Sequence, residues 1–202
     1  MAQLDVWRGD FGFAYTNRNV VDPTVRLPAF RTMLAGAHVK SVLEVGCNRG
    51  HNLATLAEVL GPDAGIAGLE PNDYARGFAA ETAPGATLVY GHADALPFAD
   101  ESFDLVLTCG VLIHVPPALY ETSLREIHRV ARRYVLAVEY FAEAETAISY
   151  REQEDLLWKR DFGGDYRRLF PELQERAGGT WMLADGFDRT RWWLLEKPGA
   201  RA

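Results

Sequence analysis

The chain has 202 residues, of which 48% are hydrophobic and 24% charged, a composition typical of a globular protein and not of a disordered one. Its 21 basic and 28 acidic side chains give a formal net charge of −7. This balance disfavours a broad contact with nucleic acid or with an anionic membrane, because both need clustered positive charge. The Cys and His residues do not have the spacing of zinc ligands, so the sequence predicts no metal site.

The expected compartment is the cytoplasm. Two cysteines, Cys47 and Cys109, are too few for a disulfide scaffold and favour a reducing environment. The first residues show no basic start followed by an apolar run, so we expect no signal peptide. No apolar stretch approaches the roughly 20 residues that a membrane-spanning helix needs.

From residue 40 to residue 140, short apolar runs alternate with helical patterns. Strands are expected over Lys40–Val45, Gly65–Leu69, Ala86–Tyr90, Phe103–Cys109 and Tyr134–Tyr140. Helices are expected over Asn52–Leu60, Tyr74–Thr82 and Pro117–Arg132. Strands that are apolar on both faces and alternate with helices predict an α/β fold with an open, doubly wound, mostly parallel sheet.

The whole chain, 1–202, is expected to form a single domain with a cofactor-binding core at residues 40–140. Three segments lie outside this core. Residues 1–22 precede the first helix and are expected to form an N-terminal cap. Residues 141–178 are expected to be a largely helical insertion, and 180–197 to form two final strands that complete a seven-stranded sheet. We expect residues 7–19 and 150–162, both rich in aromatic and charged side chains, to fold together over the carboxyl ends of the strands.

The first strand runs into a glycine loop, Glu44-Val45-Gly46-Cys47-Asn48-Arg49-Gly50. Glycines at this position permit a tight turn and a close approach of the backbone to a ligand. A strand, a glycine loop and a helix together predict a nucleotide-type site. The pattern is G-x-x-x-G. It lacks both the G-x-G-x-x-G spacing and the Lys-Ser/Thr of a P-loop, so a loop that binds a pyrophosphate is the less favoured interpretation.

Two further acids follow later strands. Glu70 ends the second strand, where a carboxylate can accept two hydrogen bonds from a ribose diol. Asp94, in the segment Gly91–Phe98, is placed to accept from an exocyclic amine, with Leu96 and Phe98 beside a base. Phe103-Asp104-Leu105-Val106 then leads to Cys109 and Gly110 at the end of the fourth strand.

This order of motifs resembles that of the class I S-adenosylmethionine-dependent methyltransferases. The resemblance covers roughly residues 40–140 and implies S-adenosyl-L-methionine as the cofactor. It implies that Gly46 lies against the methionine part and that the Cys109–Gly110 backbone lies near the amine. The cofactor-binding residues expected on this basis are Glu44, Gly46, Cys47, Asn48, Gly50, Glu70, Pro71, Asp94, Ala95, Cys109 and Gly110.

A closer resemblance, over nearly the whole chain, is to the methylases associated with pseudaminic acid biosynthesis. It rests on Trp7–Gly12, Tyr15–Asn19, Cys109–Pro117, Tyr150-Arg151 and Leu157–Gly163. It implies a small-molecule acceptor in a sugar, surface-polysaccharide or secondary-metabolite pathway. The net charge of −7 predicts that neither nucleic acid nor a membrane is a partner. The residues give no prediction of the acceptor's identity or of the oligomeric state.

Methyl transfer to a hydroxyl or an amine needs a base, whereas a carboxylate acceptor needs cations. His114, just after the fourth strand, and Glu139 and Tyr140, at the end of the fifth, are the candidate catalytic residues. Each has an alternative role, His114 at a helix start and the other two at an ordinary strand end. Candidate substrate-binding residues are Arg8, Tyr15, Arg18, Tyr150, Arg151, Trp158, Lys159 and Arg160. For the cations among them, a solvated or ion-paired role on the surface is the favoured alternative.

Two other functions fit the same pattern. A nicotinamide-dependent oxidoreductase on a similar fold is disfavoured by the G-x-x-x-G loop and by the Asp94 segment. A non-catalytic protein that binds S-adenosylmethionine is compatible with every motif.

Overall fold

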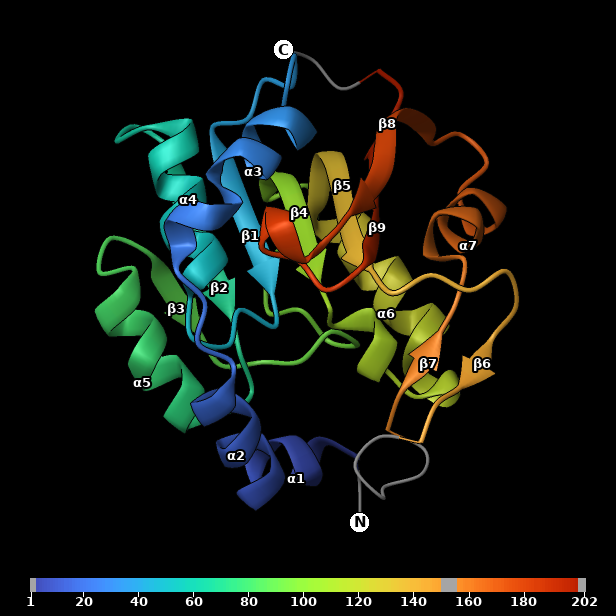
Figure 1. The fold of residues 1–202 in the computed structure, drawn as a ribbon. Coiled ribbons are helices and arrows are strands. Elements are labelled where there is room, and N and C mark those ends of the chain that lie inside the picture. The colour runs from blue at the N-terminus through green and yellow to red at the C-terminus, as the bar shows by residue number, and fades with distance from the viewer. Residues whose placement is uncertain (1–2, 150–155, 200–202) are drawn as a thin grey trace.

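The structure is a computed structural model that describes residues 3–149 and 156–199. A seven-stranded sheet, in the order β3-β2-β1-β4-β5-β9-β8, forms its centre (Figure 1). Neighbouring strands from β3 to β5 are parallel, whereas β9 is antiparallel to both β5 and β8. The predicted fold class is therefore confirmed. The strands are β1 (Ser41–Val45), β2 (Gly65–Leu69), β3 (Thr87–Val89), β4 (Phe103–Cys109), β5 (Ala131–Glu139), β8 (Gln174–Trp181) and β9 (Thr190–Glu196), with a separate pair β6 (Thr146–Ala147) and β7 (Trp158–Lys159).

Helices cover both faces of the sheet. The α-helices are α1 (Gln3–Arg8), α2 (Asp10–Arg18), α3 (Leu27–Met33), α4 (His51–Leu60), α5 (Asp73–Thr82), α6 (Pro117–Val130) and α7 (Phe162–Leu169). Short 3₁₀ turns are η1 (Pro23–Arg26), η2 (Leu112–His114) and η3 (Leu183–Asp185).

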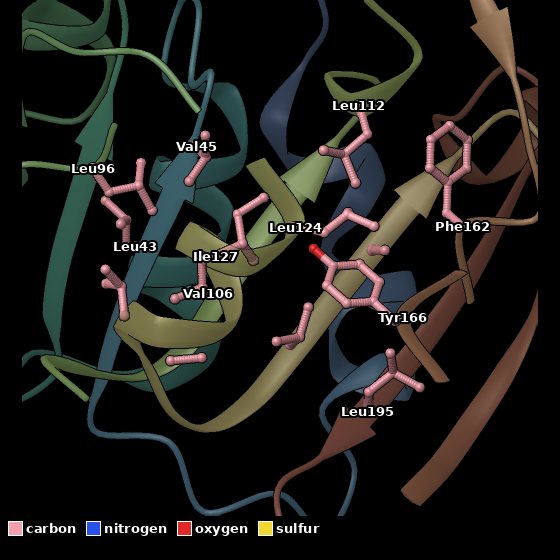
Figure 2. Packing of buried hydrophobic residues seen from close by; sticks show 14 of the residues in the cluster. Leu43, Val45, Leu96, Val106, Leu112, Leu124, Ile127, Phe162, Tyr166 and Leu195 are labelled. Carbon is pink, nitrogen blue, oxygen red and sulfur yellow. The ribbon is translucent and has the colours of Figure 1, made fainter. Parts of the chain in front are cut away.

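The alternation of side chains along each strand divides the core in two. Leu43, Val106 and Leu195 pack with α6 and α7 on one face (Figure 2), whereas Val42 and Leu105 pack with α3, α4 and α5 on the other. Successive residues of a strand point to opposite faces, so a strand covered on both sides needs an unbroken apolar run. This is why the apolar runs identified the central strands.

The region after β5 is less helical than predicted. Among its described residues, 162–169 form the only α-helix, α7, and residues 146–147 and 158–159 pair as β6 and β7. Residues 150–155 lie outside the described part of the chain. The first of the final strands, β8, begins at Gln174, inside the segment expected to be helical, and ends at Trp181. Because β8 is an edge strand with mostly exposed polar and glycine residues, it has no apolar run to reveal it.

The N-terminal helices α1 and α2 lie on the side toward which the arrowheads of β1, β2 and β4 point (Figure 1). The β6–β7 arm lies toward the same end of the molecule. In parallel sheets with helices on both faces, ligands bind at this carboxyl edge. The cap and the arm therefore stand where the core would bind a ligand.

Candidate active site at the carboxyl edge of the sheet

The loop between β1 and α4 is a tight glycine turn. Gly46 and Gly50 have left-handed backbones, with φ of 74° and 75°, and Asn48 between them has φ of 45°. The N–H groups of Gly46 and Cys47 donate to the carbonyl of Leu69 at the end of β2, at 2.7 and 3.0 Å. A Cβ on Gly46 would lie 2.5 Å from Cγ2 of Val111, so a larger residue does not fit there. The G-x-x-x-G segment thus forms the close turn that the sequence predicts.

Glu44 is buried in β1 beside this loop, with 2% of its surface exposed. Its Oε1 accepts a 2.6 Å hydrogen bond from Nδ2 of Asn52, while its Oε2 is buried without a hydrogen-bond partner among the described residues. Burial raises the pKa of Glu44 to about 8, against the opposing effects of the Asn52 hydrogen bond and the Arg26 charge. A buried carboxylate oxygen without a donor is unfavourable, so Oε2 is a position for a cationic or hydrogen-bonding ligand group.

Glu70, which follows β2, joins the loop to the next helix. Its Oε2 accepts from the N–H of Asn48 at 2.9 Å, and its Oε1 from the N–H of Asn72 at 3.0 Å. Burial raises the pKa of Glu70, and these two backbone hydrogen bonds oppose the rise. Pro71, half-buried, connects Glu70 to Asn72. A carboxylate has about four lone-pair sites, so Glu70 can hold the loop and still accept from a ribose diol.

The segment after β3 contains the predicted adenine-binding residues. Oδ1 of Asp94 lies 2.5 Å from Nδ1 of His92, and the N–H of Ala95 donates to the carbonyl of His92 at 3.2 Å. Asp94 is half-buried and Ala95 exposed, whereas the neighbouring Leu96 is in the core. The His92 partner is a feature that the sequence did not indicate, and the adenine contact of Asp94 stays a prediction.

Both cysteines are neutral thiols in packed surroundings. Burial raises the pKa of Cys47 well above its ordinary value and that of Cys109 to about 12. Neither thiol has the depressed pKa of a nucleophile, in agreement with the packing role that the sequence favours. Gly110, with φ of 65°, would have open space around an added Cβ, so its backbone faces room for a ligand.

Several buried polar atoms around this loop have no hydrogen-bond partner in the part of the chain that the structure describes. They are Nε1 of Trp7, Oε2 of Glu44, Oδ1 of Asn48 and Nε of Arg49. Buried polar groups in native proteins are nearly always paired, so a cluster of unpaired donors and acceptors indicates a site for a polar ligand. A ligand that offers both donors and acceptors could satisfy this set.

The cap closes over this edge through specific contacts. The carbonyl of Trp7, in α1, accepts from Nδ2 of Asn72 at 2.8 Å, and Asn72 also caps α5 through its Oδ1. In α2, a Cβ on Gly12 would collide with the carbonyl of Trp7 and lie 2.7 Å from Nδ2 of Asn72. The Arg49 guanidinium stacks on the ring of Phe78, 3.8 Å from its centroid. The glycine loop, α5 and the cap are thus packed as one unit.

Three predicted substrate-binding residues lie in the cap. Arg8 and Arg18 are both exposed. The guanidinium of Arg8 lies 5.7 Å from the ring centroid of Tyr90, and the guanidinium of Arg18 lies 5.2 Å from that of Tyr15. Tyr15 and Trp7 face the ring of His114, at centroid distances of 6.2 and 4.4 Å. Tyr15 therefore lies beside a predicted catalytic residue, whereas the two arginines line the outer side of the cap.

His114 ends η2, just after β4, and connects the cap to the arm. Its Nδ1 lies 3.0 Å from the carbonyl of Leu156. A carbonyl only accepts, so Nδ1 carries the proton and the lone pair of the neutral ring is on Nε2. Burial lowers the pKa of His114 to about 4, which keeps the ring neutral at physiological pH.

Glu139 and Tyr140 occupy different positions at the end of β5. Glu139 has no exposed surface, and its oxygens accept from the backbone N–H groups of Val111, Leu112 and Ile113. The hydroxyl of Tyr140, which is half-buried, donates to Asp188 at 3.1 Å. Burial and the Asp188 charge raise the pKa of Tyr140, so its hydroxyl stays protonated.

The arm places the remaining predicted residues. Trp158 is buried, and Nζ of Lys159 lies 5.8 Å from the ring of Tyr140. Arg160 is 2% exposed, bonded to Glu145 at 2.8 Å and stacked 4.0 Å from the ring of Tyr120. Tyr150 and Arg151 lie outside the described residues. A cavity of about 370 Å³ beside the arm is lined by Tyr120, Glu143, Glu145, Arg160, Asp161, Gly164, Asp165 and Arg168.

The structure thus gathers the loop residues, Glu70, Cys109, Gly110, His114 and Tyr140 at one edge of the sheet. The sequence predicts Trp7 only as part of the segment 7–19 over this edge, and it gives no indication that Asn52, Asn72 and Arg26 belong to the site. Asn72 precedes the Asp73-Tyr74 helix start, a pattern typical of an N-cap, and this signal could have found it. Nothing local marks Arg26, because its partners Asn52 and Gly186 are 26 and 160 positions away.

Part of the chain is similar in sequence to known methyltransferases. Residues 42–133 match the family described as "Methyltransferase domain". An uncharacterized methyltransferase of Synechocystis is 34% identical over 93 residues, which are 46% of this chain and 42% of that one. The demethylmenaquinone methyltransferase of Geobacillus stearothermophilus is 33% identical over 118 residues, covering 56% and 50% of the two chains. The chain thus spans half or less of the length of these relatives.

Solved structures share the fold across the chain. The 1,6-didemethyltoxoflavin-N1-methyltransferase of Burkholderia thailandensis, solved with 1,6-didemethyltoxoflavin and S-adenosylhomocysteine, has a TM-score of 0.70 at 18% identity, with 95% of this chain and 87% of that chain covered. The magnesium protoporphyrin IX methyltransferase of Synechocystis, solved with S-adenosylhomocysteine, has a TM-score of 0.68 at 15% identity, with 96% and 97% covered. Residues 42–133 are thus similar to a methyltransferase domain, and the chain shares the fold of these solved methyltransferases.

Within residues 3–149 and 156–199, none of the helices has the length and apolar character to cross a membrane. The same residues hold no group of three or more His, Cys, Asp or Glu side chains suited to a metal ion.

Proposed function

We propose that the protein transfers a methyl group from S-adenosyl-L-methionine to an oxygen, nitrogen or carboxylate of a small molecule. The observation that carries this proposal is the G-x-x-x-G turn with two buried carboxylates beside it, Glu44 with an unpartnered oxygen and Glu70 at the following strand end. The methyltransferase family match covers the same residues. The neighbours that carry S-adenosylhomocysteine support the choice of cofactor.

In this proposal the residues of the loop hold the cofactor. Gly46 and Gly110 give it backbone access, Glu44 faces its amino-acid part, and Glu70 accepts from its ribose. Asp94, with Pro71, Cys47, Asn48, Gly50, Ala95 and Cys109, completes the expected set. When bound, S-adenosylmethionine supplies the activated methyl group, and the protein's contribution is alignment.

The acceptor is proposed to enter between the cap and the arm, beside His114. Since Nδ1 of His114 donates to Leu156, Nε2 is the ring atom that would take a proton from a hydroxyl or an amine. The aromatic side chains of Trp7 and Tyr15 would cover the acceptor and exclude water, which competes for the methyl group. Glu139 is the weaker base candidate, because three backbone N–H groups already occupy its oxygens.

The substrate class is proposed as a metabolite in a sugar, surface-polysaccharide or secondary-metabolite pathway. The resemblance to methylases associated with pseudaminic acid supports the sugar assignment. The similarity to methyltransferases named for demethylmenaquinone, didemethyltoxoflavin and magnesium protoporphyrin supports a small molecule in general. The net charge of −7 and the free thiols of Cys47 and Cys109 support a cytoplasmic protein that does not act on nucleic acid.

Calorimetry tests the cofactor, and mass spectrometry tests the acceptor. The protein should bind S-adenosylmethionine and S-adenosylhomocysteine and not NADH; the reverse preference would favour the oxidoreductase. Incubation with methyl-labelled cofactor and a small-molecule extract should yield a labelled product together with S-adenosylhomocysteine. Binding without turnover on any fraction of the extract would favour a non-catalytic binding protein.

A further inference from the structure

A row of three polar side chains joins the N-terminal segment to β1. Nη1 of Arg26, the last residue of η1, donates to Oδ1 of Asn52 at 2.7 Å. Nδ2 of Asn52, in the first turn of α4, donates to Oε1 of Glu44 at 2.6 Å. Asn52 is 6% exposed, so this row lies inside the protein, and no sequence motif of the cofactor loop includes Asn52 or Arg26.

The outer member of the row is fixed by the opposite end of the chain. Nε of Arg26 donates to the carbonyl of Gly186 at 2.8 Å, and its guanidinium lies 4.5 Å from the ring of Phe187. Both partners belong to the turn between β8 and β9. A planar guanidinium held on two sides in this way presents its remaining N–H groups in one direction.

This arrangement determines how the Asn52 amide is oriented. Its oxygen must face Arg26, which has donors only, and its NH₂ group must therefore face the carboxylate of Glu44. The hydrogen bond occupies Oε1 and leaves Oε2 as the oxygen without a partner among the described residues. Arg26, Glu44 and Asn52 all affect the pKa of Cys109, the last residue of β4. The row therefore lies near the ends of both β1 and β4.

We propose that Arg26 and Asn52 are positioning residues that orient Glu44 so that its Oε2 receives the charged amino group of the cofactor. This inference rests on the proposed function. Arg26 also stabilises the ionised carboxylate through its charge, which opposes the effect of burial at Glu44. The row thus has two effects on Glu44: it sets the direction of Oε2, and it opposes the rise in pKa that burial causes, which favours the ionised form.

The test compares two ligands that differ in the amino-acid part. S-Adenosylhomocysteine carries the amino group, whereas 5′-methylthioadenosine keeps the nucleoside and the sulfur but has no amino-acid part. Asn52→Leu and Arg26→Met should each weaken S-adenosylhomocysteine binding roughly tenfold, as the loss of a hydrogen bond to a charged group does, and leave methylthioadenosine within about twofold. Glu44→Gln should show the same selectivity, and Arg31→Ala, on exposed Arg31 of α3, is the matched control.

The pattern of losses decides the outcome. If the Arg26 and Asn52 variants lose affinity for both ligands equally, the residues support the fold and do not orient Glu44, and the inference is wrong. Unchanged binding of both ligands overturns it as well. If the unaltered protein binds neither ligand, the proposed function itself fails and the inference falls with it; calorimetry on the unaltered protein separates this case from the other two.

Discussion

Glu139 and Arg160 bind the same turn, residues 111–115: Glu139 binds its backbone N–H groups and Arg160 its carbonyls. The carboxylate of Glu139 accepts from the N–H groups of residues 111, 112 and 113, at 3.1 to 3.4 Å. Nη1 of Arg160 donates to the carbonyls of Leu112 and Val115, at 3.4 and 3.3 Å. Both side chains are buried, and the turn between them carries His114. An acid and a cation that the sequence assigns to catalysis and substrate binding thus also fix the position of the candidate base.

Removing either residue should loosen this turn. Glu139→Gln leaves backbone donors with a weaker acceptor. Arg160→Met removes the donor to the carbonyl of Val115 and leaves that of Leu112 with only the Val115 N–H, so we expect each variant to lower the free energy of unfolding by about 1.5–3 kcal/mol. Urea denaturation measures the effect. The exposed pair of Arg125 with Glu121 offers a control, since Arg125→Ala should cost less than about 0.5 kcal/mol. Stability equal to that of the control would mean that the turn is held by other contacts.

Glu70 is expected to act on the cofactor through its side-chain charge. Glu70→Ala should weaken cofactor binding by roughly 1.5–3 kcal/mol, as the loss of hydrogen bonds to a charged group does. Since Glu70 also binds the N–H groups of Asn48 and Asn72, hydrogen exchange of these two amides should increase in the same variant. Isothermal calorimetry with S-adenosylhomocysteine checks the first effect. An unaltered dissociation constant would show that Glu70 holds the loop and not the ribose.

The cap should be displaced by a single methyl group. In Gly12→Ala the new Cβ would collide with the carbonyl of Trp7 and with the Asn72 amide, so α1 and α2 should leave the core and turnover should be lost. Faster hydrogen exchange over residues 3–18, with an unchanged core, is the expected signature. Gly77→Ala in α5 is the matched control, because a Cβ there meets nothing within 4 Å. Deletion of residues 1–19 should likewise silence a folded core; global unfolding of that deletion would instead make the cap part of the hydrophobic core.

His114 gives a prediction about pH. Its pKa in the folded protein is lowered to about 4, from 6.5, by burial, so the folded state binds fewer protons than the unfolded state between these values. Stability should therefore rise with pH from about 4 to 6.5, and the contribution should be lost on acidification through this window. His114→Gln should flatten the dependence, measured as the urea midpoint at several pH values. Activity should show no inflection near 6.5, and a titration of His114 at that pH by NMR would contradict the assignment.

The central sheet could be predicted because burial on both faces leaves an unbroken apolar run, as in Val42-Leu43 and Leu105–Leu107. The strand β8 could not, since an edge strand needs no such run. The glycine turn and Glu70 follow from local sequence. The clamp of Arg160 on residues 112 and 115 does not, because its partners lie more than 40 positions away and a charged residue normally indicates the surface.

The contact between Arg26 and Gly186 has a consequence for the order of synthesis. The two residues are 160 positions apart, and α4 with its glycine loop leaves the ribosome well before Gly186 does. At roughly 5–20 residues per second, the interval is on the order of ten seconds. During this time Arg26 lacks the Gly186 carbonyl that holds its guanidinium, so the Asn52 amide and the buried acid Glu44 are without their final support. A chain truncated before residue 186 never gains this support and should therefore stay sensitive to protease, however complete its first five strands are.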